Sequence, residues 1–344
     1  TYSRCLIQAL LDLSIPYRFR LYFRTPPDDG WTKGAEVRTI PFPRLWTHVR
    51  LSLEMALHPP DLLFVPAHVL PPIHPRRTLV TVHDLGYWYF PHAHPLFQRL
   101  YLDLSTRWNV RVATHILADS EATRTDLVRV YRVSPDRITV AYPGYDRTLR
   151  PICDPEALAA ARARYGIPGD YFLYLGTLQP RKNLHRIIQA FARLRTCAVL
   201  VLAGRPGWLY HDLFSRVRDL GLADRVLFPG YIRPEDRAAL LSGAVAFVFP
   251  SLYEGFGLPV LEAQACGCPV ICSTTSSLPE VAGEGALMVP PEDVQALAEA
   301  MARLEEDTSL RARLIERGFA NLHRFSWEAC ARTVLQVMER LLEG

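Results

Sequence analysis

Two adjacent cations lie in the stretch Gly176-Thr177-Leu178-Gln179-Pro180-Arg181-Lys182-Asn183, which follows a predicted strand and precedes a predicted helix. Cations at the amino end of a helix add their charge to the exposed amides and to the positive end of the dipole, so this arrangement suits a diphosphate. Lys33 and Lys182 are the only lysines in an arginine-rich chain, which singles out this position. A solvated basic helix start is the alternative interpretation. We expect Arg181 and Lys182 to bind phosphate groups.

A second candidate site spans residues 250–262 and reads PSLYEGFGLPVLE, again directly after a buried strand. Gly255 and Gly257 permit unusual backbone angles and let a ligand approach main-chain amides closely. The proline that follows suits the first turn of a helix, which places Glu254 in the loop and Glu262 about one turn inside the helix. Carboxylates make directional, charge-assisted hydrogen bonds to sugar hydroxyls. The alternatives are a helix-capping role for the first carboxylate and a solvated helix face for the second.

The spacing of these two carboxylates separates their roles. Eight helical positions span roughly 12 Å at a rise of about 1.5 Å per residue, unless the loop folds back. A retaining glycosidase holds its two carboxyl groups roughly 5–5.5 Å apart, and an inverting one roughly 6.5–9.5 Å. The spacing therefore favours contact with the two ends of one long ligand over a hydrolytic pair. A nucleotide-sugar, with polyols on both sides of a diphosphate, is such a ligand.

A third candidate, His83-Asp84, ends a short apolar run that we predict to be a strand. A histidine at the carboxyl end of a parallel strand would lie where ligands bind, and it would hydrogen-bond a sugar or an acceptor. A buried, hydrogen-bonded histidine is the alternative. Trp88 and Tyr89 follow soon after and are candidates for contact with an acceptor ring or a lipid surface, although aromatic side chains more often pack in a core.

The elements that must position these residues form two α/β series. In the first half we predict helices over 2–13 and 95–113, a helix that Ser120 caps and that runs to about Tyr131, and strands at 17–23, 79–82, 116–118 and 137–140. A second series of strands is predicted at 171–175, 198–203, 225–228, 244–249 and 269–272, with helices between them. Short apolar strands separated by helices indicate parallel sheets covered on both faces. Two doubly wound domains leave a cleft at the carboxyl ends of their strands, where ligands bind.

Composition limits the alternatives. With 344 residues, 49% hydrophobic and 22% charged, the chain can build substantial cores, and its length suggests two domains. Residues 1–150 hold 19 basic against 13 acidic side chains, and the remainder 20 against 22. A basic first half suits anionic acceptors or an anionic membrane surface, and a solvated arginine-rich face is the alternative. The sequence contains no basic stripe interleaved with aromatic residues, so we do not expect the protein to bind nucleic acid.

The seven cysteines are scattered apart from Cys266, Cys268 and Cys272. Their spacing has no paired partner motif, so we interpret them as small buried thiols and predict no metal site. An odd number of cysteines with no recognisable disulfide framework fits a reducing, cytosolic environment. No apolar run is long enough to span a membrane, so we expect a cytoplasmic protein, peripheral at most to the inner face of the cell membrane.

The candidate residues resemble family-4 glycosyltransferases of the GT-B fold, and the similarity covers nearly the whole chain. The most specific stretches are 176–183, 254–262 with its Glu-x7-Glu pattern, 199–204 with Gly230-Tyr231, 80–85 and 118–121. The resemblance implies an α/β GT-B architecture of two doubly wound, Rossmann-like domains facing across a cleft. An acceptor-side domain over 1–148 would be completed by a C-terminal helix over 328–344, and 149–327 would bind the nucleotide-sugar. Family members begin with a strand and a Gly-rich loop, and this chain starts just after them.

The resemblance also implies roles for individual residues. Arg181 and Lys182 would hold the donor diphosphate, Glu254 the hydroxyls of the transferred sugar and Glu262 the ribose. His83 would lie beside the reacting sugar, with Asp84, Trp88 and Tyr89 on the acceptor side. The remaining donor-binding residues would be Gly176, Ile232 beside the base, and the amides of Gly255, Phe256, Gly257 and Leu258.

The implied activity is retaining, metal-independent transfer of a hexose to a glycan or lipid-linked acceptor in cell-surface polysaccharide synthesis. Charge on the departing diphosphate could be stabilised by Arg181, Lys182 and a helix N-terminus, and no Asp-x-Asp pair is placed to hold Mg²⁺. The residues around His83 resemble those of bacterial polysaccharide mannosyltransferases, so GDP-mannose is the first expectation for the donor and UDP-sugars stay open. We expect no cofactor. The alternatives are a nucleotide-sugar epimerase or a phosphorylase of the same fold, or a degenerate nucleotide-sugar binding protein.

Overall fold

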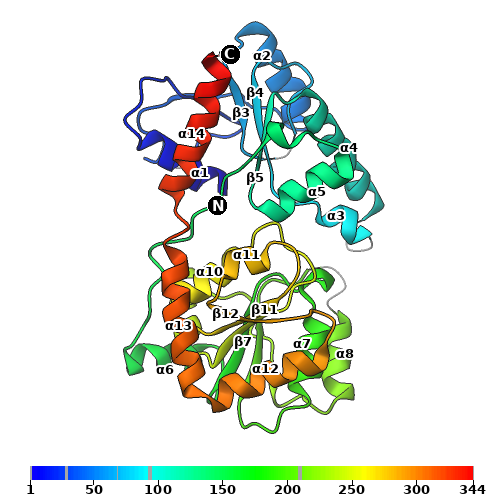
Figure 1. Ribbon diagram of the computed structural model, residues 1–344, viewed down its shortest axis with the longest axis vertical. Helices are drawn as coiled ribbons and strands as arrows, with labels where there is room; N and C mark the ends of the chain where they lie inside the picture. Colours follow the sequence, from blue (N-terminus) through cyan, green and yellow to red (C-terminus); the bar gives the residue numbers. More distant parts are fainter. Residues whose placement is uncertain (1, 28–29, 68, 92–94, 208–210, 344) are drawn as a thin grey trace. The chain divides into compact units, whose positions relative to one another are not determined.

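The computed structural model describes residues 2–27, 30–67, 69–91, 95–207 and 211–343. The chain divides into two compact units, which are drawn in Figure 1 and described separately here. The N-terminal unit comprises the described parts of Thr1–Trp88, His94–Gly144 and Phe325–Gly344. The C-terminal unit comprises the described parts of Tyr145–Arg324 and of Tyr89–Ala93. The division between Gly144 and Tyr145 falls four residues before the boundary expected from the sequence.

The C-terminal unit is built on one parallel sheet of six strands in the order β12-β11-β10-β7-β8-β9. Its central strands are mostly apolar and buried on both faces, as expected where helices cover a parallel sheet, whereas the edge strand β12 is half-buried over most of its length. They are β7 (Tyr171–Leu175), β8 (Val199–Ala203), β9 (Val226–Leu227), β10 (Ala246–Phe249), β11 (Val270–Ser273) and β12 (Ala286–Val289). The first five overlap the strands predicted from the sequence.

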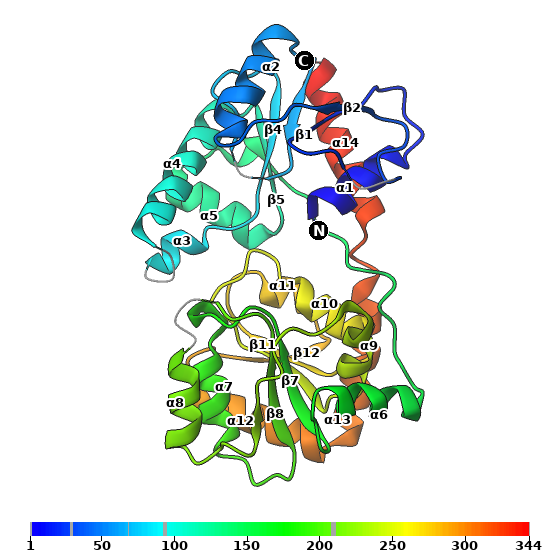
Figure 2. The same ribbon diagram turned by 180° about the vertical axis from the view of Figure 1, so that it is seen from behind.

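Helices lie on both faces of this sheet (Figures 1 and 2). They are α6 (Pro155–Arg164), α7 (Leu184–Phe191), α8 (His211–Asp219), α9 (Pro234–Ser242), α10 (Leu258–Ala265), α11 (Leu278–Ala282), α12 (Val294–Glu306) and α13 (Thr308–Leu322). Among them α7 packs against α8 and α12, and α10 against α11 and α13. This covered, doubly wound sheet places every connecting loop that follows a strand at one edge, where ligands bind in such folds.

The N-terminal unit contains a parallel sheet in the order β3-β4-β5-β6 and a separate parallel pair, β1-β2. The strands are β1 (Arg20–Phe23), β2 (Glu36–Thr39), β3 (Leu63–Val65), β4 (Thr78–Val82), β5 (His115–Ala118) and β6 (Ile138–Val140). The helices are α1 (Tyr2–Leu11), a π-helix η1 (Trp46–Leu51) continuing into α2 (Ser52–Leu57), α3 (Gly86–Tyr89), α4 (Leu96–Val112), α5 (Glu121–Tyr131) and α14 (Trp327–Glu343). As predicted, Ser120 caps α5, because its side chain accepts a hydrogen bond from the amide of Thr123.

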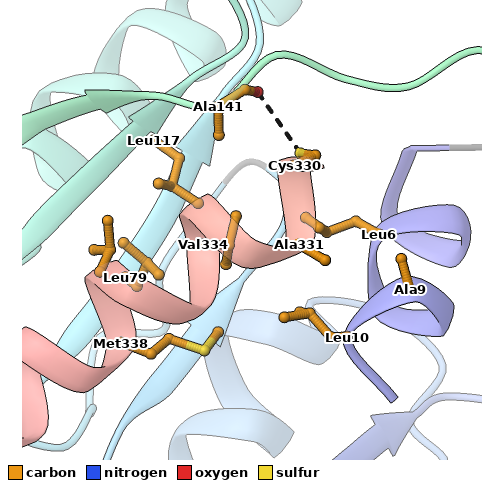
Figure 3. Packing of buried hydrophobic residues seen from close by; sticks show 11 residues of the cluster. Leu6, Ala9, Leu10, Leu79, Leu117, Ala141, Cys330, Ala331, Val334 and Met338 are labelled. Carbon is orange, nitrogen blue, oxygen red and sulfur yellow. Dashed lines mark hydrogen bonds between the residues drawn. The ribbon is translucent and has the colours of Figure 1, made fainter. Parts of the chain in front are cut away.

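The last helix of the chain completes the core of the N-terminal unit. Figure 3 shows Ala331, Val334 and Met338 of α14 packed with Leu6 and Leu10 of α1 and with Leu79 and Leu117 of the central strands. The side chain of Cys330 lies 3.8 Å from the carbonyl oxygen of Ala141. Burial of these apolar side chains ties residues more than 300 positions apart in the sequence into one unit, because the hydrophobic effect depends on the apolar area removed from water and not on sequence order.

The predicted strand at 17–23 is three residues too long, since β1 begins at Arg20 and Tyr17 is exposed. Three strands were not predicted: β2, β3 and β12. Strand β2 reads EVRT and is largely exposed, so it lacks the apolar run from which a strand is predicted. The other two are short apolar runs that periodicity alone does not distinguish from loop or helix.

Within the part of the chain that the structure describes, no helix combines the length and the apolar character needed to cross a bilayer.

Candidate functional site

Three glycines follow neighbouring strands of the C-terminal unit and bring their loops together. Gly176 follows β7, Gly204 follows β8 and Gly230 lies beyond β9. The amide of Gly176 donates to the carbonyl of Ala203 at 3.0 Å, and that of Gly204 donates to the carbonyl of Gly230 at 2.8 Å. A Cβ built on Gly204 would lie 1.8 Å from the carbonyl oxygen of Gly176, so no side chain fits there. The three glycines therefore let the backbones of neighbouring loops lie in direct contact just beyond the ends of the strands. This is the edge of the sheet where the candidate residues lie.

Arg181 and Lys182 lie in a 3₁₀ turn, η4 (Pro180–Lys182), directly before α7, as the sequence predicted. Asn183 ends the turn with a left-handed backbone (φ 63°) and donates from its side-chain amide to the carbonyl of Pro250 at 3.0 Å. The amide of Leu252 in turn donates to the carbonyl of Arg181 at 2.9 Å. The two loops that carry the candidate residues are therefore joined by one backbone hydrogen bond and one from a side-chain amide, which hold them in a fixed register.

The carboxylate of Glu254 binds both cations. Lys182 Nζ donates to Glu254 Oε1 at 2.5 Å, and Arg181 Nη1 donates to Glu254 Oε2 at 3.1 Å and to the carbonyl of Tyr253 at 2.5 Å. Lys182 Nζ also lies 4.8 Å from the centroid of the Phe249 ring, which is a cation–π contact. The structure thus unites the two motifs that the sequence treated as separate sites.

Burial and charge act in opposite directions on Glu254. Burial alone would raise the pKa of this carboxyl group, but the charges of Lys182 and then Arg181 hold its pKa below the ordinary value for glutamate. The group is therefore ionised at neutral pH. Two cations against one carboxylate leave the cluster with a surplus positive charge at the amino end of a helix, which is an arrangement that attracts anions.

The loop between Glu254 and α10 is held by serine side chains. Gly257 has φ 117° and occupies the N-cap position of α10, and a Cβ there would lie 2.7 Å from Leu278. Ser277 Oγ donates to the carbonyls of Glu254 at 3.0 Å and of Phe256 at 2.5 Å. The amides of Gly255, Phe256 and Leu258 belong to this fixed turn, so their directions are set before any ligand binds.

Glu262 lies inside the first turns of α10, as predicted, and has a partner of its own. Arg237 Nη1 of α9 donates to Glu262 Oε1 at 3.0 Å. Burial raises the pKa of Glu262, Arg237 opposes that rise, and Asp146 adds to it. The two glutamates of the Glu-x7-Glu pattern therefore lie in different electrostatic environments, one stabilised as an anion and the other shifted toward the neutral form.

Ile232 is half-buried in the loop that precedes α9, next to an exposed aromatic ring that the sequence analysis assigned no role. The ring of Tyr231 is 54% exposed, and the guanidinium carbon of Arg205 lies 4.9 Å from its centroid. Arg205 follows Gly204 directly, so both residues come from strand ends of the same edge. A flat, exposed tyrosine backed by arginine is suited to stacking a heterocyclic base.

In the N-terminal unit, His83 follows β4 and Asp119 follows β5. Because β4 and β5 are neighbours, the two side chains meet, and His83 Nδ1 lies 2.7 Å from Asp119 Oδ2. Tyr2 approaches the imidazole edge-on with ring centroids 4.6 Å apart. Burial alone would lower the pKa of His83, but the Asp119 carboxylate holds its pKa above the ordinary value. Asp119 lies in a stretch that resembles the family, but its pairing with His83 was not predicted from the sequence.

The other residues expected on the acceptor side cap the short helix α3 or lie within it. Asp84 Oδ1 accepts a hydrogen bond from the amide of Gly86 at 2.7 Å and so caps the start of the helix. Trp88 is exposed and lies 6.2 Å from the ring of Tyr131, and Tyr89 ends the helix half-buried. Their contact with an acceptor stays a prediction.

The clustered cysteines are buried thiols, as the sequence analysis predicted. Cys266, Cys268 and Cys272 are free and buried, and burial raises the pKa of each thiol. Among the residues that the structure describes, no three His, Cys, Asp or Glu side chains gather in a way that would hold a metal ion.

Family comparisons cover both units of the chain. Residues 160–321 match the family model for glycosyl transferases group 1, and residues 24–149 match that for Glycosyltransferase Family 4. The chain is 33% identical over 270 residues to the O-antigen chain mannosyltransferase B of Escherichia coli, covering 77% of this chain and 71% of that protein. The chain belongs to the family-4 glycosyltransferases. It is therefore a transferase, and nothing in these comparisons favours an epimerase.

Solved structures place this glycosyltransferase in the GT-B fold. Sucrose-phosphate synthase from Thermosynechococcus elongatus superposes with a TM-score of 0.77 at 24% identity, over 99% of this chain and 93% of that one. The Anabaena protein Alr3699/HepE, solved with UDP and glucose, gives a TM-score of 0.75 at 19% identity over 98% and 96%. The serotype-specific mannosyltransferase WbdA of E. coli is a longer relative, of which this glycosyltransferase spans 31%.

Proposed function

We propose that this glycosyltransferase transfers a hexose, with mannose as the first candidate, from a nucleotide-diphosphate sugar to a glycan or lipid-linked acceptor in cell-surface polysaccharide synthesis. The observation that carries the proposal is the cluster of Arg181, Lys182 and Glu254, which joins two loops at the carboxyl edge of the C-terminal sheet. The mannosyltransferase relatives from E. coli support the choice of sugar and of acceptor class. The structural neighbour with bound UDP supports a nucleotide donor.

The donor diphosphate would replace Glu254 as the partner of the two cations. Arg181 and Lys182 would then stabilise the charge that builds on the diphosphate as the sugar leaves, without requiring a metal ion. Glu254, released from part of its pairing, would accept hydrogen bonds from the hydroxyls of the transferred sugar. Positive charge that is already in place costs no reorganisation at the moment of bond cleavage, which is why this exchange favours the transition state.

The rest of the donor would follow the loops away from this cluster. Glu262 is proposed to bind the ribose, because Arg237 holds one of its oxygens at 3.0 Å and fixes the direction of the carboxylate. Ile232 and the exposed ring of Tyr231 are proposed to flank the base. Gly176 and the amides of residues 255–258 would line the sugar and the phosphates.

We assign His83 to the reacting sugar and Asp84, Trp88 and Tyr89 to the acceptor. With a raised pKa, His83 favours its charged form and is better suited to donating hydrogen bonds than to removing a proton. No side chain is assigned as a covalent nucleophile. The proposal is therefore a front-face substitution with retention of the anomeric configuration, in which the departing diphosphate takes the acceptor proton.

An anionic membrane surface is proposed as a further partner, with the enzyme peripheral to the inner face of the cell membrane. The excess of arginine in residues 1–150 supports this contact, because basic surfaces are attracted to anionic lipid headgroups.

Product analysis with and without acceptor tests the proposed reaction. The protein would be incubated in EDTA with GDP-mannose, and in parallel with UDP-sugars, and the products examined by NMR. We expect glycoside with the anomeric configuration of the donor, formed only when acceptor is present. Inversion would contradict retention, and an absolute need for Mg²⁺ would contradict metal independence. Consumption of the donor in the absence of acceptor would indicate an epimerase or a hydrolase. Binding of the donor without turnover would indicate a degenerate nucleotide-sugar binding protein.

A further inference from the structure

Helix α4 of the N-terminal unit exposes most of its large apolar side chains, and three of its four buried residues are polar. Its buried residues are Ser105, Thr106, Asn109 and Val110. Thr106 accepts a hydrogen bond from Tyr87 Oη at 2.8 Å, and Asn109 Oδ1 accepts one from the amide of Leu70 at 2.9 Å. The exposed large apolar residues of the helix are Leu96, Phe97, Leu100, Tyr101, Leu104 and Trp108. A helix that packs on a globular core has the opposite pattern.

The exposed side chains form one stripe. Phe97, Tyr101, Leu104 and Trp108 are spaced by three and four residues, so they lie on the same face of the helix. Phe97 is 84% exposed and Leu104 is 63% exposed. Isolated exposed apolar residues need no explanation, but a contiguous stripe marks an interaction surface.

A second stripe continues the surface on η1 and α2. Val49, Leu53 and Leu57 are exposed at intervals of four residues, and Leu45 lies exposed just before η1. The rings of His48 and Tyr101 lie 6.1 Å apart and connect this stripe with α4. Both helices can be followed in Figure 2.

A groove lies between η1, which contributes His48, and α4. It has a volume of about 290 Å³ and is lined by His48, Val69, Leu70, Pro72, Tyr101, Leu104, Ser105 and Trp108. Ile73, which follows the lining residue Pro72, is also exposed, and its amide donates to Ser52 Oγ of α2 at 3.4 Å. We call the surface made by segments 44–58, 72–77 and 96–112 the apolar face.

The charges of the apolar face are almost all positive. Its three segments carry seven arginines, no lysine and two acidic residues. Both acidic residues are already paired: Glu54 accepts from Arg38 Nη1 at 2.6 Å and from Arg50 Nη1 at 3.3 Å, and Asp103 accepts from Arg107 Nε at 2.9 Å. The surface therefore presents apolar side chains with a surplus of arginine and calls for a partner that is apolar and anionic.

We propose that the apolar face docks on the surface of an anionic lipid bilayer, with α4 and α2 lying in the plane of the headgroups. An interfacial helix of this kind combines an apolar stripe of Leu, Phe and Trp with basic residues that reach the lipid phosphates. A second copy of the chain fits less well, since a symmetric contact would set arginines of one face against those of the other. This inference rests on the membrane contact in the proposed function and assigns it to particular residues.

Flotation with lipid vesicles tests the proposal. The full chain would be mixed with vesicles of phosphatidylcholine alone and with vesicles containing 30% phosphatidylglycerol, at low and high salt. We expect binding to the anionic vesicles that weakens in high salt, because headgroup attraction is screened. Phe97→Ser/Leu104→Ser should weaken this binding at least tenfold, whereas Phe319→Ser, at an exposed phenylalanine of α13, should leave it unchanged. Arg76→Glu/Arg111→Glu should weaken binding to anionic vesicles only.

Four results would overturn the proposal. Two are a wild-type protein that does not bind anionic vesicles and a Phe97→Ser/Leu104→Ser variant that still binds them. A wild-type dimer that this variant dissociates would assign the apolar face to a second copy, and capture of an acidic protein in place of vesicles would assign it to a protein partner. Transfer to a soluble acceptor, measured on the same samples, separates this proposal from the proposed reaction. We expect the Phe97→Ser/Leu104→Ser variant to retain transfer to the soluble acceptor. A wild-type protein that binds vesicles but shows no transfer would disprove the proposed reaction and leave the docking proposal standing.

Discussion

Lys182 Nζ donates to Glu254 Oε1 at 2.5 Å, although the two residues are 72 positions apart in the sequence. The contact joins the loop after β7 to the loop after β10, two strands that are neighbours in the C-terminal sheet. Both side chains are largely buried, and Arg181 shares the carboxylate. Each side chain of this pair therefore has a structural role before a donor arrives and a proposed chemical role afterwards.

Removing the lysine should affect both roles. Lys182→Met leaves the buried carboxylate of Glu254 with only Arg181, so we expect the free energy of unfolding to fall by about 3 kcal/mol, as measured by urea denaturation. The double variant Lys182→Met/Glu254→Gln should recover part of that stability, because the buried carboxylate is then gone, while Arg181 loses its anion and keeps the carbonyl of Tyr253 as a partner. It should not recover transfer. If it did, the cluster would be structural and would not act in catalysis.

Glu262 should control donor affinity in a pH-dependent way. The pKa of this carboxyl group is raised, so the group becomes protonated at a higher pH than an ordinary glutamate as the solution is acidified. If the carboxylate binds the ribose, the KM for the donor should rise as the pH falls toward 5, with little change in kcat. Glu262→Gln should have a raised KM at neutral pH and lose this dependence. A KM that varies equally in both proteins would disprove the assignment.

The pair of His83 and Asp119 should make the stability of the N-terminal unit depend on pH. Because the pKa of His83 is raised in the folded chain, the pair contributes stability that is fully present below the unfolded value, about 6.5, and is lost as pH rises through the folded value. Urea denaturation across this range should show the loss, and Asp119→Asn should abolish it. NMR of the imidazole carbons would give the pKa directly, and an unshifted value would contradict the pairing.

Gly204 should tolerate no side chain. A Cβ at this position would lie 1.8 Å from the carbonyl oxygen of Gly176, and the glycine has φ 148°. We expect Gly204→Ala to lower the melting temperature by several degrees, corresponding to a loss of about 2 kcal/mol or more, and to weaken donor binding with it. Gly169→Ala is the matched control, since nothing lies within 4 Å of a Cβ there. Equal melting temperatures for the two variants would show that the backbone contact is dispensable.

The elements that the sequence predicts well are those with strong local signals. Strands such as β7 and β8 are continuous apolar runs, and the helix that begins near Pro259 follows from proline in its first turn and glycine at its cap. Strand β2 escapes prediction because its residues are polar and exposed. Its conformation comes from pairing with β1 and not from local preference.

The candidate site was predictable residue by residue, but its contacts were not. Arg181, Lys182 and Glu254 stood out by charge and by position after strands, yet nothing local states that β7 and β10 are neighbours. The pair of His83 and Asp119 has the same origin, because it depends on β4 lying beside β5. Spacing along the chain suggested that Glu254 and Glu262 act apart, whereas their partners, Lys182 and Arg237, became visible only in the fold.

The proposed transfer requires that a nucleoside diphosphate bind at Arg181 and Lys182. Calorimetric titration of the full chain with GDP and with UDP, in EDTA, measures this without an acceptor. We predict that one of them binds with one site per chain, and that Arg181→Ala/Lys182→Ala weakens its affinity about 100-fold or more, while Gly169→Ala does not change it. Binding of neither nucleotide by the wild-type protein, or equal affinity in the double variant, would contradict the account.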